Sequence, residues 1–318
     1  MGEARGMRVT ETVLTWLLDA DPSIRWQVMR DLTGAAAAEV AAERARVATE
    51  GWGRHLLDQQ RPDGQWGDGI STKLWWSNMY TLVWLRDLGI DPGSAGARAA
   101  IDRVRAHVTW GAEFGHSPFF DGEVEPCING RVAALAAYFG VRSDRLVDRL
   151  LGEQLADGGW NCEAERGSVR SSFHTTICVL EGLLAFEQAF GAAPPITGAR
   201  TRAHEYLLER HLLRRRSTGE IINVEWTRFS FPTLWHYDVL RGLDYLRAAG
   251  VTPDARVDEA VAAVTHRRQH GLAAVEGRWR LDARHKNTLY PGMAGEVDAP
   301  NRWITLRALR VLDWSGRP

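Results

Sequence analysis

Three side chains of types that bind metal ions occur in a part of the sequence where a pattern is repeated. Glu125 and Cys127 flank a proline, and His174 follows Cys127 after 47 residues (174 − 127 = 47). Carboxylate, thiolate and imidazole groups are all zinc ligands, and three protein ligands with one open position are typical of a catalytic zinc site. If the two segments begin equivalent helices of neighbouring repeats, the three side chains converge. The spacing therefore makes Glu125, Cys127 and His174 candidate ligands of a metal ion.

Cys162 is a further candidate ligand of this site. It could complete a closed site of four protein ligands, which would be structural, or it could replace Glu125. The alternative without a metal is that Cys127 is a small buried residue at an apolar helix start and that His174 forms an ordinary hydrogen bond. Three cysteines in 318 residues are too few for a disulfide framework, so reduced thiols are expected.

His236, Tyr237 and Asp238 are a second group with possible catalytic chemistry. A histidine and an aspartate at the mouth of a cavity could transfer protons. Adjacent residues on a helix point about 100° apart, so the three side chains cannot all face one cavity. We expect either His236 or Tyr237 to face it and the other to be packed.

The elements that position these groups are indicated by a repeated segment. The pattern Gln-x-x-Asp-Gly-x-Trp occurs at residues 60–66 and again at 154–160, each time between two amphipathic stretches. The glutamine could bond the free carbonyls at the end of its helix, Asp-Gly favours a turn, and the tryptophan buries a large ring. The repeat therefore predicts a structural corner of a helical repeat protein.

Hydrophobic periodicity predicts six pairs of helices. The expected first members span 10–19, 37–60, 95–108, 143–154, 199–213 and 254–269, and the second members span 22–33, 72–88, 127–140, 170–190, 232–248 and 300–314. Because the second members are richer in apolar and aromatic residues, we expect them on the inside of an all-α (α/α)6 toroid; an open array is the alternative. The toroid is expected to be a single domain over 1–318, with 1–8 disordered or loosely attached. A short hairpin is possible around 220–224.

In such a toroid the beginnings of the inner helices surround a central cavity. Aromatic walls with a few polar groups suit an apolar or cationic ligand, although the same tryptophans could simply fill a large core. The residues predicted to bind a substrate there are Trp26, Trp75, Trp76, Trp235, Arg302 and Trp303.

The corner segments resemble the QW motifs of triterpene cyclases such as squalene-hopene cyclase and, more loosely, the repeats of protein prenyltransferase β subunits. Those β subunits bind zinc through Asp-x-Cys on one inner helix and through an aromatic-His-Thr segment on the next. This chain is similar at Glu125-Pro126-Cys127 and at Phe173-His174-Thr175. The resemblance implies zinc bound by Glu125, Cys127 and His174. The chain lacks the Arg and Lys that hold a diphosphate in the transferases and the Asp-x-Asp-Asp acid motif of the cyclases.

Charge and hydropathy limit the other functional classes. The chain has 39 basic and 40 acidic residues and a net charge of −1, which gives no footprint for nucleic acid. No stretch approaches the roughly 20 apolar residues of a membrane span, and the start lacks an apolar signal core, so a cytoplasmic protein is expected.

Together these features predict a zinc-dependent enzyme, a transferase or cyclase, that acts on an apolar or isoprenoid-type substrate. One alternative is a metal-free terpenoid cyclase or isomerase that stabilises cations with aromatic rings. Another is a non-catalytic toroid that binds a lipid or a peptide. Whether a protein partner is needed is left open.

Overall fold

The computed structural model describes residues 9–67, 73–270 and 277–316, which form helices joined by turns and a few isolated β-bridges. The predicted loose attachment of residues 1–8 lies outside these ranges. The all-α class and the succession of helix pairs are confirmed. The chain divides into two compact units, which we call the terminal unit (Met1–Glu43 with Leu207–Pro318) and the central unit (Arg44–Tyr206). Closure into one toroid and the grouping as a single domain stay predictions.

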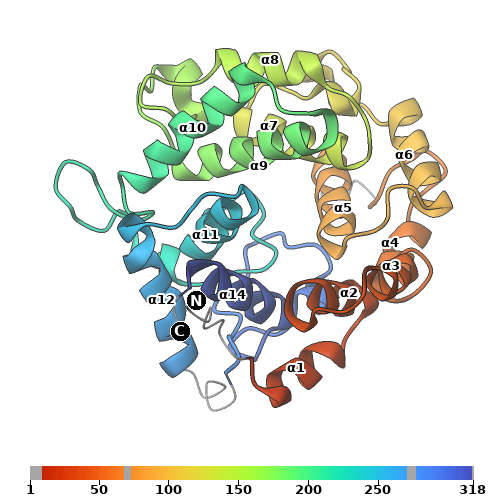
Figure 1. Cartoon of the computed structure of the whole chain (residues 1–318). Coiled ribbons are helices and arrows are strands. Elements are labelled where there is room, and N and C mark those ends of the chain that lie inside the picture. Colours follow the sequence, from red (N-terminus) through yellow and green to blue (C-terminus); the bar gives the residue numbers. More distant parts are fainter. Residues whose placement is uncertain (1–8, 68–72, 271–276, 317–318) are drawn as a thin grey trace. The chain divides into compact units, whose positions relative to one another are not determined.

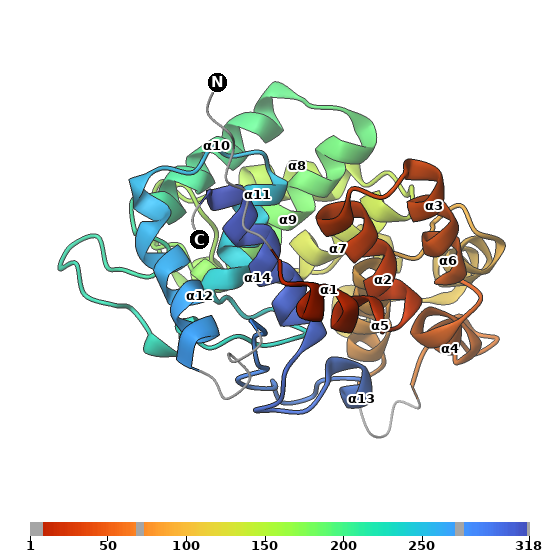
Figure 2. The ribbon, with the colours of Figure 1, turned by 60° about the horizontal axis from the view of Figure 1, so that its bottom comes forward.

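The central unit contains most of the helix pairs. Its helices are α4 (Gly51–Asp58), α5 (Leu74–Leu88), α6 (Ala95–His107), α7 (Pro126–Tyr138), α8 (Asp144–Gly152), α9 (Phe173–Phe190) and most of α10 (Pro194–Leu208), with short 3-10 turns η2 (Ala112–Phe114), η3 (Phe119–Asp121) and η4 (Cys162–Arg166). Figures 1 and 2 show α7 and α9 side by side. Nearly all residues of α7 are buried, as expected for an inner helix.

Helices α7 and α9 approach each other through their backbones. A Cβ atom at Gly130 would lie 2.5 Å from the carbonyl oxygen of Cys178, and one at Gly182 would meet the carbonyl of Gly130. Only glycine allows this separation, because any side chain would push the helices apart. The contact fixes the relative positions of the two helix beginnings, which carry Cys127 and His174.

The two corner tryptophans have identical roles. Both indole rings are fully buried. Each ring N–H donates to the carbonyl of a residue ten positions earlier, from Trp66 to Leu56 at 2.8 Å and from Trp160 to Leu150 at 2.6 Å. These carbonyls belong to the last turns of α4 and α8, which have no further partner within their helices. The tryptophans therefore close the helices that precede them.

The corner glutamines act differently from the prediction. Their amides do not bond the end of their own helix; each bonds the turn and the following outer helix. The bonds run from Gln60 to the carbonyls of Gly64 and Ala100 (both 2.9 Å) and from Gln154 to those of Gly158 (2.7 Å) and Ala199 (2.8 Å). Each corner thus connects two consecutive helix pairs, through α6 or α10.

The terminal unit combines both ends of the chain. Its helices are α1 (Glu11–Leu18), α2 (Pro22–Val28) with the π-helical turn η1 (Met29–Thr33), most of α3 (Ala37–Arg46), α11 (Val239–Ala248), α12 (Asp258–His270), α13 (Pro291–Ala294) and α14 (Arg302–Ser315), with 3-10 turns η5 (Val224–Thr227) and η6 (Ala255–Val257). Helix α14 contacts α2, α11 and α12.

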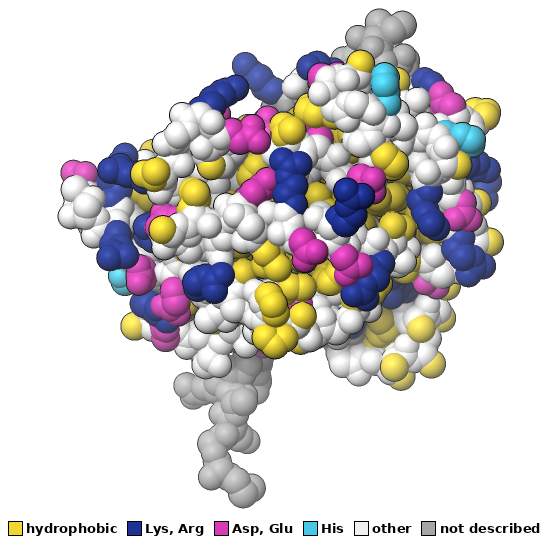
Figure 3. All heavy atoms as spheres, turned by 90° about the horizontal axis from the view of Figure 1, so that it is seen from above, with side chains coloured by type: hydrophobic (Ala, Val, Ile, Leu, Met, Phe, Trp, Pro, Cys, Tyr) yellow, Lys and Arg dark blue, Asp and Glu magenta, His cyan; other side chains and the backbone are white. Residues whose placement is uncertain are grey.

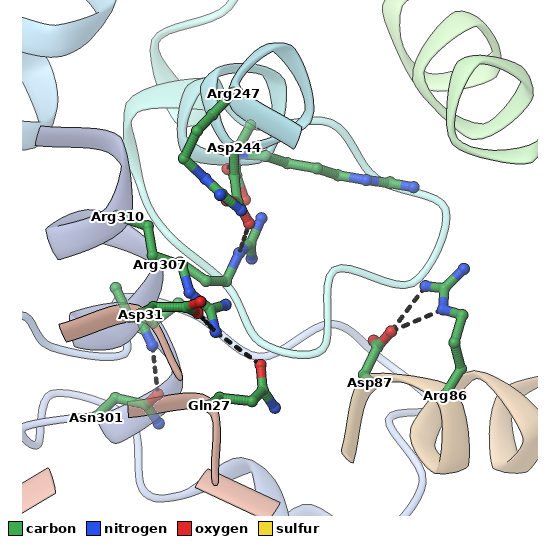
Figure 4. Close-up of polar contacts among 12 residues, drawn as sticks. Gln27, Asp31, Arg86, Asp87, Asp244, Arg247, Asn301, Arg307 and Arg310 are labelled. Carbon is green, nitrogen blue, oxygen red and sulfur yellow. Dashed lines mark hydrogen bonds and ion pairs between the residues drawn. The ribbon is translucent and has the colours of Figure 1, made fainter. Parts of the chain in front are cut away.

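Ion pairs join the helices around α14. Figure 4 shows Asp244 of α11 held by Arg247 and by Arg307 of α14. Arg310, one turn further along α14, pairs with Asp31 of η1 at 2.5 Å. The neighbouring arginines lower the pKa of Asp31 and Asp244 against the effect of burial. These charges stabilise the junction of the first and last helices of the chain.

The terminal unit contains a third corner, which is hardly visible in the sequence. Trp279 is fully buried, and its ring N–H donates to the carbonyl of Val264 in α12 at 2.8 Å, as the other two corner tryptophans do. Gly277 has a positive φ of 72°, like the glycines of the other corners. The segment keeps only the Gly-x-Trp part of the pattern, because no glutamine or aspartate stands at the matching positions.

Two helix predictions need correction. The stretch 37–60 forms two helices, α3 and α4, because Gly51 adopts a positive φ of 56° that interrupts a continuous helix. The helix expected at 232–248 begins only at Val239, since the Asp238 carboxylate accepts the N–H of Arg241 and caps the helix there. The possible hairpin is present in reduced form, as one antiparallel bridge between Arg214 and Ile221.

The surface agrees with the balanced charge of the sequence. On the face drawn in Figure 3, basic and acidic side chains are interspersed, and neither sign gathers in a large patch. No helix within the described ranges has both the length and the apolar character that crossing a membrane requires.

Candidate functional site

The structure brings three of the four candidate metal ligands together. Glu125 is the N-cap of α7, Cys127 is the second residue of that helix, and Cys162 begins η4. One ligand atom from each side chain lies within 4.8 Å of the others. The Cys127 Sγ and the Glu125 Oε2 are 3.6 Å apart. We call Glu125, Cys127 and Cys162 the thiol cluster.

Local hydrogen bonds hold the chain that leads into α7. The Asn129 side chain accepts the N–H of Glu123 at 2.8 Å and donates to its carbonyl at 3.0 Å. The Glu123 carboxylate in turn accepts the N–H of Glu125 at 2.7 Å. Arg149 of α8 donates to the carbonyl oxygens of Glu123 and Val124. With Pro126 in the first position of α7, these bonds fix the backbone that carries Glu125 and Cys127.

Cys162 is positioned from the other side. Asn161 caps η4 by accepting the N–H of Glu163 at 3.0 Å. The Cys162 Sγ lies 3.4 Å from the hydroxyl oxygen of Thr175, on the first turn of α9. Cys127 is buried, Cys162 is half-buried and Glu125 is exposed. The cluster is therefore enclosed by protein at Cys127 and opens to solvent at Glu125.

The two thiols influence each other's protonation. A hydrogen bond with Cys162, followed by burial, raises the pKa of Cys127, while the same hydrogen bond lowers the pKa of Cys162. A thiol that donates to a neighbouring sulfur stabilises the thiolate form of that neighbour. Of the two thiols, Cys162 is therefore the one whose pKa this hydrogen bond lowers.

The donor set fits zinc. With a zinc–sulfur bond of about 2.3 Å and a zinc–oxygen bond of about 2.1 Å, two ligands of a tetrahedral ion lie about 3.6 Å apart. That is the separation of the Cys127 sulfur and the Glu125 oxygen. Two thiolates and a carboxylate leave one of four positions open.

His174 lies outside this group, although the resemblance placed it among the ligands. It is the second residue of α9, next to Thr175, and it is half-buried. Its assignment as a ligand stays a prediction. Cys162, which the sequence offered as an addition to the site or a substitute within it, joins the cluster directly.

In the terminal unit, two side chains of the candidate acid–base group, Asp238 and Tyr237, form hydrogen bonds with backbone groups. Asp238 is 5% exposed and caps α11, and burial raises the pKa of its carboxyl group. The Tyr237 hydroxyl donates to the carbonyl of Leu212 at 2.7 Å, and its ring packs edge-on against Trp226. Either His236 or Tyr237 was expected to be packed, and the packed residue is Tyr237. None of the three residues lies within a helix.

His236 is the member of this group that takes part in a ring stack. Its imidazole lies between Trp235, at a centroid distance of 3.9 Å, and His285, at 3.7 Å. Trp235 is 37% exposed. Stacking orients the imidazole, which is a requirement for proton transfer, but the role of His236 in catalysis stays a prediction.

Two of the other predicted substrate residues in this unit have structural contacts. Arg302 donates to the carbonyls of Trp16 and Asp19, at the end of α1, and its guanidinium lies over the Trp16 ring. Trp303 stacks on Phe231 with ring centroids 4.8 Å apart. These contacts hold the start of α14 in place.

The other three tryptophans predicted to bind a substrate lie in α2 and α5. Trp26 is buried in α2 beneath the guanidinium of Arg30. Trp75 and Trp76, in the central unit, are half-buried at the start of α5 and meet edge to face. Substrate binding by these residues stays a prediction.

Solved structures similar to the chain include those of a type II terpene cyclase. Apo MstE from Scytonema is 18% identical, with a TM-score of 0.45, and the match covers 92% of this chain and 87% of that one. A variant of MstE in complex with geranylgeranyl dihydroxybenzoate is 16% identical, with a TM-score of 0.45 and coverage of 93% and 86%. No family model and no curated protein matches the chain.

The supports of the thiol cluster were not recognised in the sequence. Asn129 and Glu123 hold the loop before α7, and Arg149 contacts it from α8. An asparagine two residues after a candidate ligand was the available signal, because asparagine side chains often bond nearby backbone groups. The partner from α8 has no local sequence signal.

Proposed function

We propose that the protein is a zinc-dependent enzyme that acts on an apolar, isoprenoid-type substrate. The observation that carries this proposal is the thiol cluster, because two sulfurs and a carboxylate within 4.8 Å form a donor set suited to zinc. The isoprenoid class of substrate is supported by the resemblance of the Glu-x-Cys and Phe-His-Thr segments to the prenyltransferase β subunits.

Each residue of the cluster has a distinct part in this proposal. Cys127 and Cys162 bind the ion as thiolates, and the Thr175 hydroxyl donates to the Cys162 sulfur and orients it. The exposed Glu125 is the ligand most easily exchanged. A zinc ion bound here would favour the thiolate form of a substrate thiol or act as a Lewis acid on a substrate oxygen. The open position lets a substrate atom approach without loss of a protein ligand.

The first experiment measures metal content. Untagged wild-type protein and the variants Cys127→Ala, Cys162→Ala and His174→Ala are equilibrated with zinc, dialysed and measured by elemental analysis. Cys178→Ala is the matched control, because it removes the remaining thiol, which lies outside the cluster. We expect about one zinc per chain in the wild type and control and little zinc in Cys127→Ala and Cys162→Ala, because loss of a ligand should cost more than the roughly 10–100-fold in affinity that loss of an outer-shell partner costs.

The other results of this experiment are equally informative. Loss of zinc in His174→Ala would identify the fourth ligand, whereas retention would leave that position for substrate. A metal-free wild type, or zinc retained in both cysteine variants, would contradict the proposal. The zinc-loaded protein is then incubated with farnesyl and geranylgeranyl diphosphates, with and without a small thiol, and products are sought by mass spectrometry. If neither compound is converted, the isoprenoid class is wrong.

A further inference from the structure

Arg131 of α7 is a buried arginine with two unsatisfied guanidinium nitrogens. Only 2% of the residue is exposed, and within the described part of the chain neither its Nε nor its Nη2 has a partner. The guanidinium carbon lies 5.6 Å from the centre of the Tyr80 ring, on α5. Tyr80 is itself 2% exposed.

This arrangement has a cost. A buried donor without a partner is destabilising, because it loses its hydrogen bonds to water and gains none in the protein. Packing over an aromatic ring compensates for this only in part. Part of the cost of burying the charge is left without compensation by protein atoms.

Other buried arginines of the chain are paired. Arg200 forms an ion pair with Glu187. Arg241, as buried as Arg131, donates to the carbonyls of Leu234 and His236. The fold therefore provides acceptors for buried guanidinium groups elsewhere, and Arg131 differs from them.

The position of Arg131 relates it to the thiol cluster. It follows Cys127 by four residues, so both lie on the same face of α7, one helical turn apart. The preceding residue, Gly130, faces α9 at the close backbone contact. Adjacent residues diverge by about 100°, so Arg131 lies off that contact, on the side where it meets Tyr80 of α5.

We propose that Arg131 binds the anionic group of the ligand that reaches the thiol cluster, either a carboxylate or a phosphate. The fork of the guanidinium matches both groups, and such charge-assisted bonds are about twice as strong as neutral ones. The Arg131 Nε and Nη2, which have no partner among the described residues, are the groups that donate to the anion. The ligand is then an amphiphile with an apolar part and one anionic end. This inference relies on the proposed function for the nature of the apolar part.

Calorimetric titration tests the anion separately from the metal. Farnesyl diphosphate, farnesoic acid and the uncharged farnesol are titrated into the full-length protein, once loaded with zinc and once freed of metal by EDTA. We expect at least one of the two anions to bind at least tenfold more tightly than farnesol in both states. The stronger of the two distinguishes a phosphate from a carboxylate. Anion binding that is lost with EDTA, or equal affinity for anions and farnesol, would overturn the assignment.

Three variants locate the effect. Arg131→Met should weaken the preferred anion at least tenfold and leave farnesol binding unchanged, and Arg131→Lys, which keeps the charge without the fork, should lie between. Arg145→Met is the matched control, because it removes an exposed arginine of the same unit. Unchanged anion affinity in Arg131→Met would show that the inference is wrong.

Melting temperatures show whether Arg131 serves the ligand or the fold. Because it removes a buried charge without partners, Arg131→Met should unfold at the same temperature as ligand-free wild type or at a higher one, and the anion should stabilise only the wild type. A lower melting temperature of the ligand-free variant would show that Arg131 serves the fold. If zinc binding fails but the anion response persists, the proposed function is wrong and the anion site stands.

Discussion

The thiol cluster and the segment His236–Asp238 contain similar reactive side chains, but the fold uses them in different ways. In the cluster, the side chains face one another, and the surrounding bonds hold the backbone that carries them. In the second segment, Asp238 and Tyr237 are themselves bound to backbone groups. A carboxylate or hydroxyl that already satisfies a backbone group is less available for a substrate.

The difference shows why residue type alone is a weak guide to chemistry. Both groups combine a carboxylate with other titratable side chains, and both come near the start of an inner helix. In the cluster, Pro126 begins α7, and the Glu125 carboxylate makes no capping bond to the helix backbone, so it can face the Cys127 thiol. In the other segment the helix has no proline at its first turn, and Asp238 starts it through its own side chain.

The variant Asp238→Ala separates the two regions most strongly. It removes the cap of α11 and a carboxylate that also accepts the N–H of Ser230, so the unfolding free energy should fall by about 2–3 kcal/mol. Zinc content should not change. Urea denaturation followed by circular dichroism gives the stability, and elemental analysis gives the metal.

Asp144→Ala is the matched control for this variant. Asp144 is the first residue of α8 in the central unit, but it is exposed and its ion pair with Arg142 lies at the surface, so its loss should have little effect. If Asp238→Ala were as stable as this control, Asp238 would be free to act on a substrate. The distinction between the two regions would then fail.

Several features of the fold follow from local sequence. The two complete corners predicted a helical repeat, and the buried Trp66 and Trp160 confirm their structural role. The corner at Trp279 could not be predicted, because its bond to Val264 needs neither the glutamine nor the aspartate of the pattern. The helix start at Val239 was placed too early, since apolar periodicity does not show which residue caps a helix.

The candidate site could be predicted only in part. Spacing brought Glu125 and Cys127 together on one helix start, and local geometry keeps them there. Cys162 comes from a turn whose position depends on Asn161 and on contacts with α9, so the sequence offered it only as an alternative. No sequence signal shows that the Arg131 Nε and Nη2 lack acceptors among the described residues, because this depends on how the surrounding helices pack.

The stability of the central unit should depend on pH through His204. Burial, together with Arg200, lowers the pKa of His204 in α10 to about 4, against about 6.5 for an unfolded histidine. Between these values the unfolded chain binds a proton that the folded chain does not, so this contribution to stability is present above pH 6.5 and is lost as the pH falls towards 4. Wild-type protein should lose about 2 kcal/mol more than His204→Gln between pH 7 and pH 5.

The same pH series shows whether zinc is released in acid because the central unit unfolds or independently of unfolding. If the central unit unfolds through His204, zinc release should follow unfolding in the wild type and move to lower pH in His204→Gln. The exposed His107, at the end of α6, provides the control variant His107→Gln, which should behave like the wild type. Equal pH profiles of wild type and His204→Gln would show that His204 has no part in acid unfolding.

The smallest expected effect is that of Tyr237→Phe, and it tests the second region most directly. The change removes only the hydroxyl that donates to Leu212, so the unfolding free energy should fall by about 1 kcal/mol. Tyr206→Phe is the matched change in the central unit, where the hydroxyl donates to the carbonyl of Ser171 at 2.8 Å, and it should cost a similar amount. Denaturation of both variants and titration of both with farnesyl diphosphate give the comparison. Unchanged stability of Tyr237→Phe together with weaker ligand binding would mean that this hydroxyl serves the ligand. In that case His236, Tyr237 and Asp238, and not the thiol cluster alone, would contact the substrate.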